Sequence, residues 1–204
     1  MKLLIASTNP GKLIEIFDIL NDLDVELLTP SQMGISLQVE EVGETYAENA
    51  ALKGRAFAEQ SGLLTLADDS GLEVEALSGA PGLHSARYVN RVGATDADRR
   101  KALLQALDGL PRPWIAHFRC VVALATPKGM LRLTEGVCPG EIIPQERGQG
   151  GFGYDPIFYL PEPGCTMAEL PMAEKNRLSH RARAVLAAKP IILEMLNANG
   201  KRQP

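Results

Sequence analysis

The stretch KLLIASTNPGK, residues 2–12, is an apolar run followed at once by small polar and turn-forming residues. Working outward from it, the next apolar side chains recur at helical spacing: Leu13, Ile14, Ile16, Phe17, Leu20 and Leu23. The chain therefore opens with a strand, a polar loop over residues 7–12, and a helix. This order favours an α/β fold.

Four further segments have the length and apolar content of strands: residues 25–28, 63–67, 115–125 and 130–137. The last two flank the turn Pro127-Lys128-Gly129, which predicts an antiparallel hairpin. The strand at 63–67 is expected to run into a polar loop, Asp68-Asp69-Ser70-Gly71. With no internal repeat or linker, the sequence predicts one α/β unit with helices around a mixed sheet.

Helices are predicted near residues 45–58, from Thr95 to Leu107, and after Ser179. Thr95 is expected to be the N-cap of its helix, with Asp98 completing a capping box. Pro190 is expected to interrupt or restart the last helix, because proline lacks the N–H group that a helix interior needs.

Bulk properties limit the function classes. The 204 residues suit one domain or two closely packed lobes that share a core. A net charge of −4 gives no general attraction for nucleic acid, so an anionic ligand needs a local basic cluster. The N-terminal apolar run is too short for a signal peptide or a membrane span. Cys120, Cys138 and Cys165 form no Cys-x-x-Cys pair, which favours free thiols and a cytoplasmic protein.

The opening loop is a candidate phosphate site. A helix that starts behind a strand and a short loop presents backbone N–H groups and a positive dipole end. Ser7, Thr8 and Asn9 add side-chain donors and Lys12 adds a charge. The loop is not a P-loop, because Ala6 and Leu13 replace the residues that this motif requires. The alternative is an ordinary helix cap with a solvated lysine.

Two acidic pairs, Glu40-Glu41 and Asp68-Asp69, are candidate ligands of Mg²⁺. Mg²⁺ binds one or two carboxylates and fills its other positions with water and phosphate. A metal-bound water near a carboxylate can attack a phosphorus atom. Solvated turn residues are the alternative interpretation. Neighbouring strand residues point to opposite sides, so only one of the two aspartates should serve such a site.

A third candidate lies in the C-terminal half, where Gly148 to Tyr154 reads GQGGFGY. Glycines permit close approach of a ligand, and Phe152 or Tyr154 offers a face for base stacking. Asp155 can accept hydrogen bonds from purine N–H groups, and further donors follow at Lys175, His180 and Arg181. A flexible hairpin loop and a basic, exposed helix face are the alternatives.

Five motifs in order carry a family resemblance: STNPGK (7–12), EEVGETYAENA (40–50) with Lys53, ADDSGLEVEALSGAPGLHSARY (67–88), GGFGYDPIF (150–158) and EKNRLSHR (174–181). From Leu4 to about Leu196 the chain resembles the Ham1/inosine triphosphate pyrophosphatase family, bacterial branch. The resemblance implies a single domain over residues 1–204. It also implies an elongated mixed sheet flanked by helices, two lobes with a nucleotide cleft between them, and a homodimer.

The activity implied is Mg²⁺-dependent hydrolysis of ITP, dITP and XTP to the nucleoside monophosphate and pyrophosphate, which clears deaminated purines from the nucleotide pool. No nucleic-acid or membrane partner is implied. Two rival interpretations are a related pyrophosphatase acting on pyrimidine or modified nucleotides, and a nucleotide sensor without turnover. The intact set Lys12, Glu40, Lys53 and Asp69 speaks against a sensor, which needs neither a bound metal nor a base.

Carried onto this sequence, the resemblance makes Asp69 the proton acceptor and a metal ligand. Glu40 is the expected second metal ligand, with Glu41 as the less favoured neighbour. Arg181 or Lys175 is expected to donate to the C6 oxygen of hypoxanthine or xanthine, where adenine carries an amino group. The substrate-binding residues implied are Ser7, Thr8, Asn9, Pro10, Gly11, Lys12, Lys53, Ser70, Phe152, Gly153, Tyr154, Asp155, Lys175, His180 and Arg181.

Overall fold

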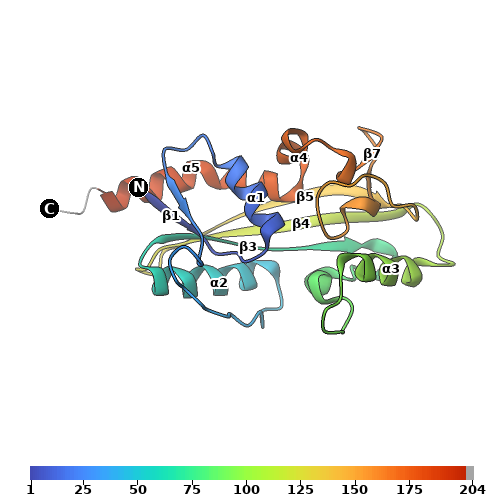
Figure 1. The fold of residues 1–204 in the computed structure, drawn as a ribbon, viewed down its shortest axis with the longest axis horizontal. Helices are drawn as coiled ribbons and strands as arrows, with labels where there is room; N and C mark the ends of the chain where they lie inside the picture. The colour runs from blue at the N-terminus through green and yellow to red at the C-terminus, as the bar shows by residue number, and fades with distance from the viewer. Residues whose placement is uncertain (201–204) are drawn as a thin grey trace. The chain divides into compact units, whose positions relative to one another are not determined.

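A computed structural model describes residues 1–200, with side chains described up to residue 197. Its seven-stranded sheet has the order β2-β1-β3-β4-β5-β6-β7. The strands are β1 Lys2–Ile5, β2 Glu26–Leu28, β3 Leu64–Val74, β4 Trp114–Ala125, β5 Leu131–Ile142, β6 Phe158–Leu160 and β7 Cys165–Thr166. β1 pairs in parallel with β2 and β3, whereas β6 is antiparallel to β5 and β7. The predicted mixed sheet is therefore confirmed (Figure 1).

The helices are α1 Pro10–Ile19, α2 Tyr46–Ser61, α3 Asp96–Leu107, α4 Met172–Leu178 and α5 His180–Gly200. Short 3₁₀ turns occur at Glu75–Leu77, Gly82–Arg87, Asp155–Ile157 and Met167–Glu169. The chain divides into two compact units. Among the described residues, the first contains residues 1–69, 120–136 and 181–200, and the second contains residues 70–119 and 137–180. β3, β4 and β5 each contribute to both units.

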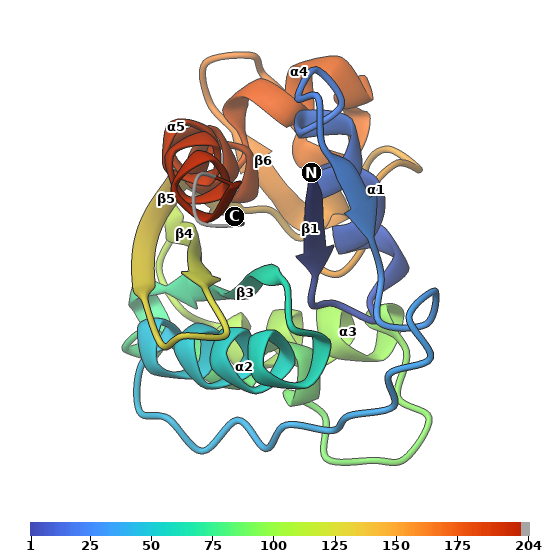
Figure 2. The same cartoon turned by 90° about the vertical axis from the view of Figure 1, so that its left-hand side faces the viewer.

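In the first unit, α1 and α5 cover one face of the sheet and α2 covers the other (Figure 2). The strands show why, because alternate residues pack on alternate sides. Leu3 and Ile5 join the core under α1 and α5, whereas Leu4 packs with Phe57 of α2. In β3, Leu66 belongs to the core under α1 and α5, and Ala67 to the core over α2. Asp68 and Asp69 continue this alternation.

The second unit has a core of its own. The inner residues of β3, α3, β4 and β5 pack there with those around β6, including Leu72, Leu103, Phe118, Ile142 and Phe158. Thr95 is the N-cap of α3 and forms a full capping box with Asp98, as predicted. The polar segment 143–154 that precedes β6 contains the glycine-rich loop and has no regular secondary structure apart from turns.

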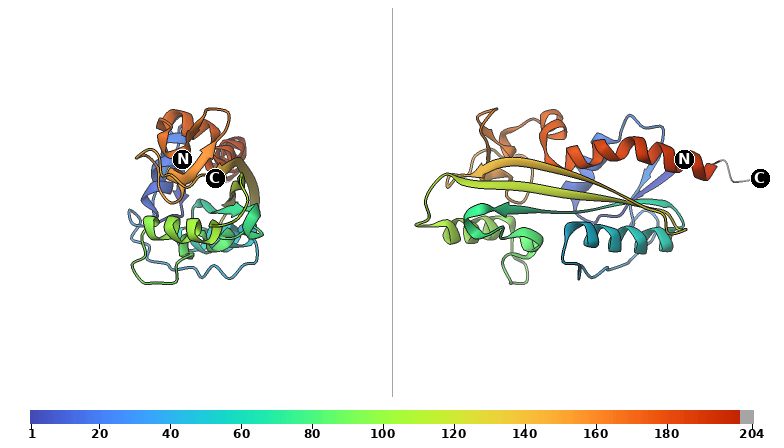
Figure 3. Two further views of the ribbon diagram at one scale, coloured as in Figure 1. Left: turned by 90° about the vertical axis from the view of Figure 1, so that its right-hand side faces the viewer. Right: turned by 180° about the vertical axis from the view of Figure 1, so that it is seen from behind.

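Three sequence predictions need correction. Residues 68–71 are not a loop, because β3 continues through them to Val74 and their charges are buried by partners described below. Pro10, Gly11 and Lys12 form the first turn of α1, where a proline is tolerated because its missing N–H would lack a helical partner anyway. Pro190 does not end α5, which runs through it (Figure 3). Pro190 is exposed, and the residues flanking it pack on the core.

Within the described residues, no helix has both the length and the apolar character needed to cross a membrane. The three cysteines are free, as expected, and only Cys165 is more than marginally accessible. Burial raises the pKa of the Cys120 thiol to about 12, so this side chain is a neutral part of the core.

Candidate active site

The N-terminus of α1 follows directly from the local sequence. Asn9 is its N-cap, and the side-chain oxygen accepts a hydrogen bond of 3.2 Å from the backbone N–H of Lys12. Ser7 Oγ in turn accepts from the N–H of Asn9 at 3.3 Å. Thr8 is exposed beside them. The loop residues and the first turn, which includes Gly11, therefore gather backbone N–H groups and one lysine, an arrangement suited to anions.

Asp68 is the buried centre of an ion-pair network. Its Oδ2 lies 2.9 Å from Lys12 Nζ on α1 and 3.3 Å from Arg181 Nε on α5. Arg181 also forms a short ion pair with Glu15 of α1, and both side chains are 2% exposed. Burial alone would raise the pKa of the Asp68 carboxyl, but Lys12 and Arg181 overcome it and hold this pKa well below its ordinary value. Asp68 is therefore a permanently charged structural carboxylate.

Asp69 lies on the opposite side of β3 and has different partners. Its Oδ1 is 3.5 Å from Lys53 Nζ on α2, and Lys53 also pairs with Glu41 Oε1 at 2.7 Å. Burial raises the pKa of the Asp69 carboxyl; Lys53 opposes this shift, and the Glu41 carboxylate adds to it. Asp69 Oδ2 is buried and has no hydrogen-bond partner in the described part of the chain.

The seven side chains Lys12, Glu15, Glu41, Lys53, Asp68, Asp69 and Arg181 are called the charged cluster below. Four carboxylates against three cations leave one net negative charge. An unpartnered buried carboxylate oxygen in such a surrounding fits a hard divalent cation, which needs only one or two protein ligands. No group of three or more His, Cys, Asp and Glu side chains that could hold a metal occurs among the described residues.

The acidic segment before α2 is positioned by Asn49. This residue is 1% exposed, and its Oδ1 accepts a 2.8 Å hydrogen bond from the N–H of Gly43. The capping box between Thr45 and Glu48 fixes the start of the same helix. Glu41 thereby reaches Lys53, whereas Glu40, the expected second metal ligand, is exposed. The structure brings Glu41 rather than Glu40 into contact with the charged cluster.

In the second unit, Asp155 and Lys175 form a buried ion pair, with side chains 5% and 4% exposed. Asp155 Oδ2 also accepts from the N–H of Phe152 at 2.8 Å, and Lys175 Nζ lies 5.2 Å from the centroid of the Phe152 ring. These three residues are called the loop cluster. They place an aromatic face beside buried polar groups. A Cβ at Gly151 would lie only 2.1 Å from Asp155 Oδ2, and φ there is +71°, so only glycine fits.

Tyr154 is buried and holds the glycine-rich loop against its own unit. It is 4% exposed, and its hydroxyl donates to the carbonyl of Ser85 at 2.9 Å. Ser85 Oγ accepts from the N–H of Leu72 in β3. Tyr154 therefore ties the glycine-rich loop to its own unit, and of the two aromatic residues Phe152 is the one that is only half-buried. Ser70, directly after Asp69 in β3, is also half-buried.

His180 and Arg181 are neighbours in sequence with separate partners. The ring of His180 stacks on Phe118 at 4.6 Å with 12° between the planes, inside the second unit. Arg181 belongs to the charged cluster of the first unit, with Asp68 and Glu15. The structure therefore groups Arg181 with Lys12 and Asp68, and it groups Lys175 with Phe152 and Asp155.

Sequence reasoning missed several polar residues at these sites. Glu15 carries a signal, since it is an acidic residue among the apolar positions of a predicted helix, and it is buried. Asn49 also lies on a predicted helix, where nothing marks it as inward-facing. Asp96 and Arg100 contact Gly153 of the glycine-rich loop, and Glu146 contacts Arg100, only through long-range folding.

Fold and site together define a class: α/β proteins in which a charged cluster surrounds a buried strand and the start of a helix. The family model described as the Ham1 family matches residues 3–191. The chain belongs to this family, and the predicted resemblance is confirmed.

The sequences and structures of similar proteins match most of the length of this chain. The dITP/XTP pyrophosphatase of Desulforamulus reducens is 45% identical over 193 residues, which are 94% of this chain and 96% of the relative. The dITP/XTP pyrophosphatase of Synechocystis sp. is 48% identical over 184 residues, 89% of this chain and 90% of the relative. Among solved structures, a HAM1 protein from Coxiella burnetii superposes with a TM-score of 0.86 at 41% identity, covering 95% of this chain and 99% of that one.

Proposed function

We propose that this chain is a nucleoside-triphosphate pyrophosphatase that converts ITP, dITP and XTP into the monophosphate and pyrophosphate. The observation that carries the proposal is Asp69, whose buried Oδ2 has no hydrogen-bond partner in the described residues although Lys53 and Glu41 lie beside it. Family membership supports the substrate class, since relatives that match over nearly their whole length are named dITP/XTP pyrophosphatases.

Each part of the charged cluster has a separate task in this reaction. The N–H groups at the start of α1, with Lys12 and Lys53, neutralise the triphosphate. Asp69 accepts the proton of the attacking water. The bond between the α-phosphoryl group and its bridging oxygen breaks, and pyrophosphate leaves with that oxygen. Asp68, which lies on the side of β3 opposite to Asp69, holds Lys12 in place through its ion pair.

We propose Mg²⁺ as the cofactor, bound by Asp69 with the acidic pair Glu40-Glu41. When bound, the cation supplies charge neutralisation at the phosphates and lowers the pKa of water. Because Glu41 already contacts Lys53, which also pairs with Asp69, Glu41 is at least as well placed as Glu40. Separate Glu40→Gln and Glu41→Gln variants, titrated with Mg²⁺, identify the ligand as the variant with the weaker metal affinity.

The loop cluster supports recognition of the purine base. Phe152 offers the stacking face, and Lys175 carries three N–H donors beside it. A lysine donor pairs with the C6 oxygen of hypoxanthine or xanthine and opposes the C6 amino group of adenine. An opposed pair of buried donors gives discrimination of about 10⁴-fold. Arg181 and Lys175 are both ion-paired, but only Lys175 lies beside the Phe152 ring, so Lys175 is the favoured residue for this role.

The test is pyrophosphate release with Mg²⁺ from ITP, XTP, dITP, GTP and ATP, with the nucleotide products identified. Rapid release from ITP, dITP and XTP with a monophosphate product, and little from ATP or GTP, is the expected result. Inorganic phosphate with a diphosphate product would contradict the proposed reaction. Tight binding of ITP without turnover would favour a nucleotide sensor, and preferred turnover of pyrimidine or methylated nucleotides would favour the other rival.

Two further properties belong to the proposal. The chain is expected to form a homodimer, which sedimentation of the purified protein tests directly. It is expected to act in the cytoplasm on free nucleotides rather than on nucleic acid, in keeping with its net charge of −4. Fractionation of expressing cells tests the compartment.

A further inference from the structure

The glycine-rich loop, Gly148–Tyr154, has little conformational preference of its own. Four of its seven residues are glycine. Gly148, Gly151 and Gly153 have φ values of +79°, +71° and +62°. Glycine loses more conformational freedom on ordering than any other residue. Contacts from outside the loop must therefore determine where Phe152, between two of these glycines, is held.

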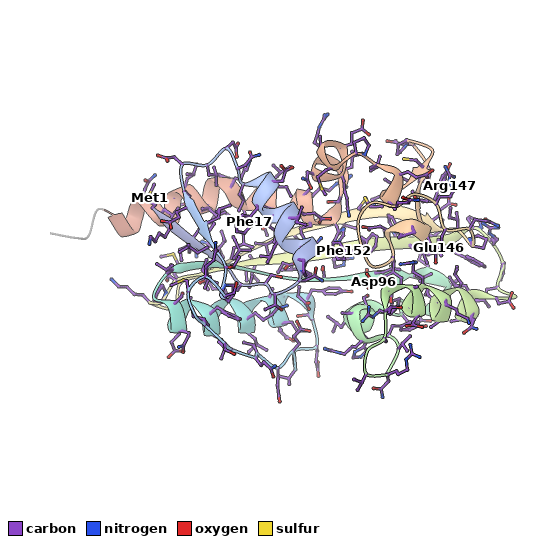
Figure 4. The ribbon with its side chains drawn as sticks, in the orientation of Figure 1. Met1, Phe17, Asp96, Glu146, Arg147 and Phe152 are labelled. Atoms are coloured by element: carbon purple, nitrogen blue, oxygen red, sulfur yellow. The ribbon has the colours of Figure 1, made fainter. Side chains whose placement is uncertain are left out.

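Helix α3 supplies such contacts on both sides of Gly153. Asp96 Oδ2 accepts a 2.7 Å hydrogen bond from the N–H of Gly153, and Arg100 Nη1 donates a 2.9 Å bond to its carbonyl oxygen. Asp96 and Arg100 are four residues apart and so share one face of the helix. Figure 4 labels Asp96 and Phe152, which lie close together beside the start of α3.

Both contacting side chains are themselves held in place. Arg100 Nε and Nη2 donate to the two carboxylate oxygens of Glu146, each at 2.9 Å, which is a bidentate pair. The Arg100 side chain is only 12% exposed. Asp96 Oδ1 accepts from Arg99 Nη1 at 2.6 Å. We call Asp96, Arg100 and Glu146 the α3 clamp.

The clamp acts directly next to the loop cluster. Gly153 follows Phe152, whose N–H donates to Asp155 and whose ring lies beneath Lys175. On the other side of Phe152, the N–H of Gly150 donates to the carbonyl of Ala168 at 3.0 Å. The backbone on the two sides of Phe152 is thus held at Gly150 and at Gly153, and charged side chains of α3 make the contacts at Gly153.

We propose that Asp96, Arg100 and Glu146 are positioning residues for base recognition: they hold Gly153 so that Phe152 is presented to the purine beside Lys175. The inference rests on the proposed function and deepens it. The three residues do not touch the reacting phosphates, so their loss affects binding and selectivity of the base rather than the chemical step.

The test compares Arg100→Gln and Asp96→Ala with the unaltered protein, using pyrophosphate release from ITP and from ATP. Each variant is expected to raise KM for ITP by about tenfold, the usual effect of losing a charge-assisted hydrogen bond. The kcat is expected to change by no more than about twofold, because the lost interaction concerns binding. The preference for ITP over ATP, as a ratio of kcat/KM values, is expected to fall, because the clamp positions the groups that distinguish the C6 oxygen from the C6 amino group.

Matched variants separate positioning from general damage. Asp96→Asn keeps an acceptor oxygen for Gly153 and is expected to restore most of the ITP preference. Arg100→Lys keeps the charge but not the bidentate pair with Glu146, and is expected to restore little. Arg91→Gln is the control, because Arg91 forms an exposed ion pair with Asp98 of α3 and, within the described residues, none with the glycine-rich loop. It is expected to leave KM and selectivity unchanged.

Hydrogen exchange gives a readout that does not depend on catalysis. The Gly153 amide, which donates to Asp96, is expected to exchange faster in Asp96→Ala and Arg100→Gln, with thermal unfolding of both variants close to that of Arg91→Gln. Equal losses with ITP and ATP through kcat, or unchanged Gly153 exchange, would overturn the inference. If the unaltered protein itself released no pyrophosphate, the proposed function would fail at that control, before any variant is compared.

Discussion

Six of the seven side chains in the charged cluster are carried by β3, α1, α2 and α5, whereas the aromatic ring of the loop cluster, Phe152, is carried by a loop in which four of seven residues are glycine. In the charged cluster, β3, α1, α2 and α5 each deliver a side chain, and opposite charges hold one another. In the loop cluster, one ion pair and a backbone N–H surround an aromatic ring, and a neighbouring helix must hold the backbone.

This difference separates two ways in which a site can fail. Charges in a buried network cannot be removed singly without leaving a partner uncompensated, so the charged cluster is expected to respond through large changes in rate or stability. A loop held by hydrogen bonds can shift without unfolding the unit, so the loop cluster is expected to respond through affinity and selectivity. Four predictions follow this contrast, from the largest expected effect to the smallest.

Asp69→Asn is expected to lower kcat for ITP by about 10²–10⁴-fold, because the amide cannot accept a proton from water. Nucleotide affinity, measured by equilibrium binding, is expected to stay within about tenfold of the original, since Lys12 and Lys53 remain. Asp68→Asn is the matched control, since it changes the adjacent carboxylate. This variant is expected to lower the free energy of unfolding more than it lowers kcat. Equal losses of kcat in both variants would contradict the assignment of catalysis to Asp69 and of ion pairing to Asp68.

Arg181→Gln is expected to lower the free energy of unfolding by about 3–5 kcal/mol, because it removes the Arg181 cation from the buried Glu15 and leaves Asp68 paired with Lys12. Urea unfolding measures the loss. Arg183→Gln, an exposed change on the same helix, should shift stability by no more than about 0.5 kcal/mol. A stable Arg181→Gln protein with impaired base selectivity would instead assign Arg181 to base recognition.

Gly151→Ala is expected to raise KM for ITP and to cost about 1–2 kcal/mol of stability from the positive φ alone. The new methyl group must also displace the Asp155 carboxylate. Gly62→Ala is the control, because φ there is +70° and a Cβ would meet nothing within 4 Å. Thermal unfolding and kinetics of both variants separate backbone strain from the disturbed loop cluster. If Gly151→Ala and Gly62→Ala had the same KM for ITP, a role of Asp155 in nucleotide binding would be contradicted.

Asp98→Asn is expected to alter the acid dependence of stability slightly. The hydrogen bond from the Thr95 N–H, followed by those from its hydroxyl and from Arg91, lowers the pKa of Asp98 in the folded state. Because this pKa is lowered on folding, the ionised Asp98 stabilises the folded state at pH values above its unfolded pKa of about 3.9. This stabilisation is lost as the pH falls through the pKa of Asp98 in the folded state. The difference in Tm between the two proteins should therefore shrink below about pH 4. A difference independent of pH would contradict this.

Much of the framework could be predicted from the sequence, because local patterns produce local structure. The apolar run at residues 2–6 contains β1, a helix begins near Thr45, Thr95 is an N-cap, and the turn at Pro127-Lys128-Gly129 joins β4 to β5. The Ham1 family was also correctly inferred from five motifs. These features depend on nearest neighbours in the chain and need no long-range information.

The errors arise where distant charges decide the local structure. Asp68 and Asp69 look like loop residues by composition, yet they lie inside β3, because Lys12, Lys53 and Arg181 compensate their burial. Glu41 rather than Glu40 reaches the charged cluster through the position of Gly43 against Asn49. The α3 clamp joins residues 46 to 57 positions apart, which no local pattern indicates. The roles assigned to the individual site residues stay predictions.

Asp68 and Asp69 lie on opposite sides of β3. The site is therefore sensitive to the number of residues that precede them in this strand, and not only to which residues are present. A single residue inserted or deleted between Leu66 and Asp68 would exchange the sides on which the two carboxylates lie. The permanently charged carboxylate beside Arg181 and the carboxylate of raised pKa beside Lys53 would then swap surroundings, although every amino acid of the motif was still present. An intact motif can therefore place its two carboxylates on the wrong sides of β3, and the spacing to the preceding strand is the feature to check first.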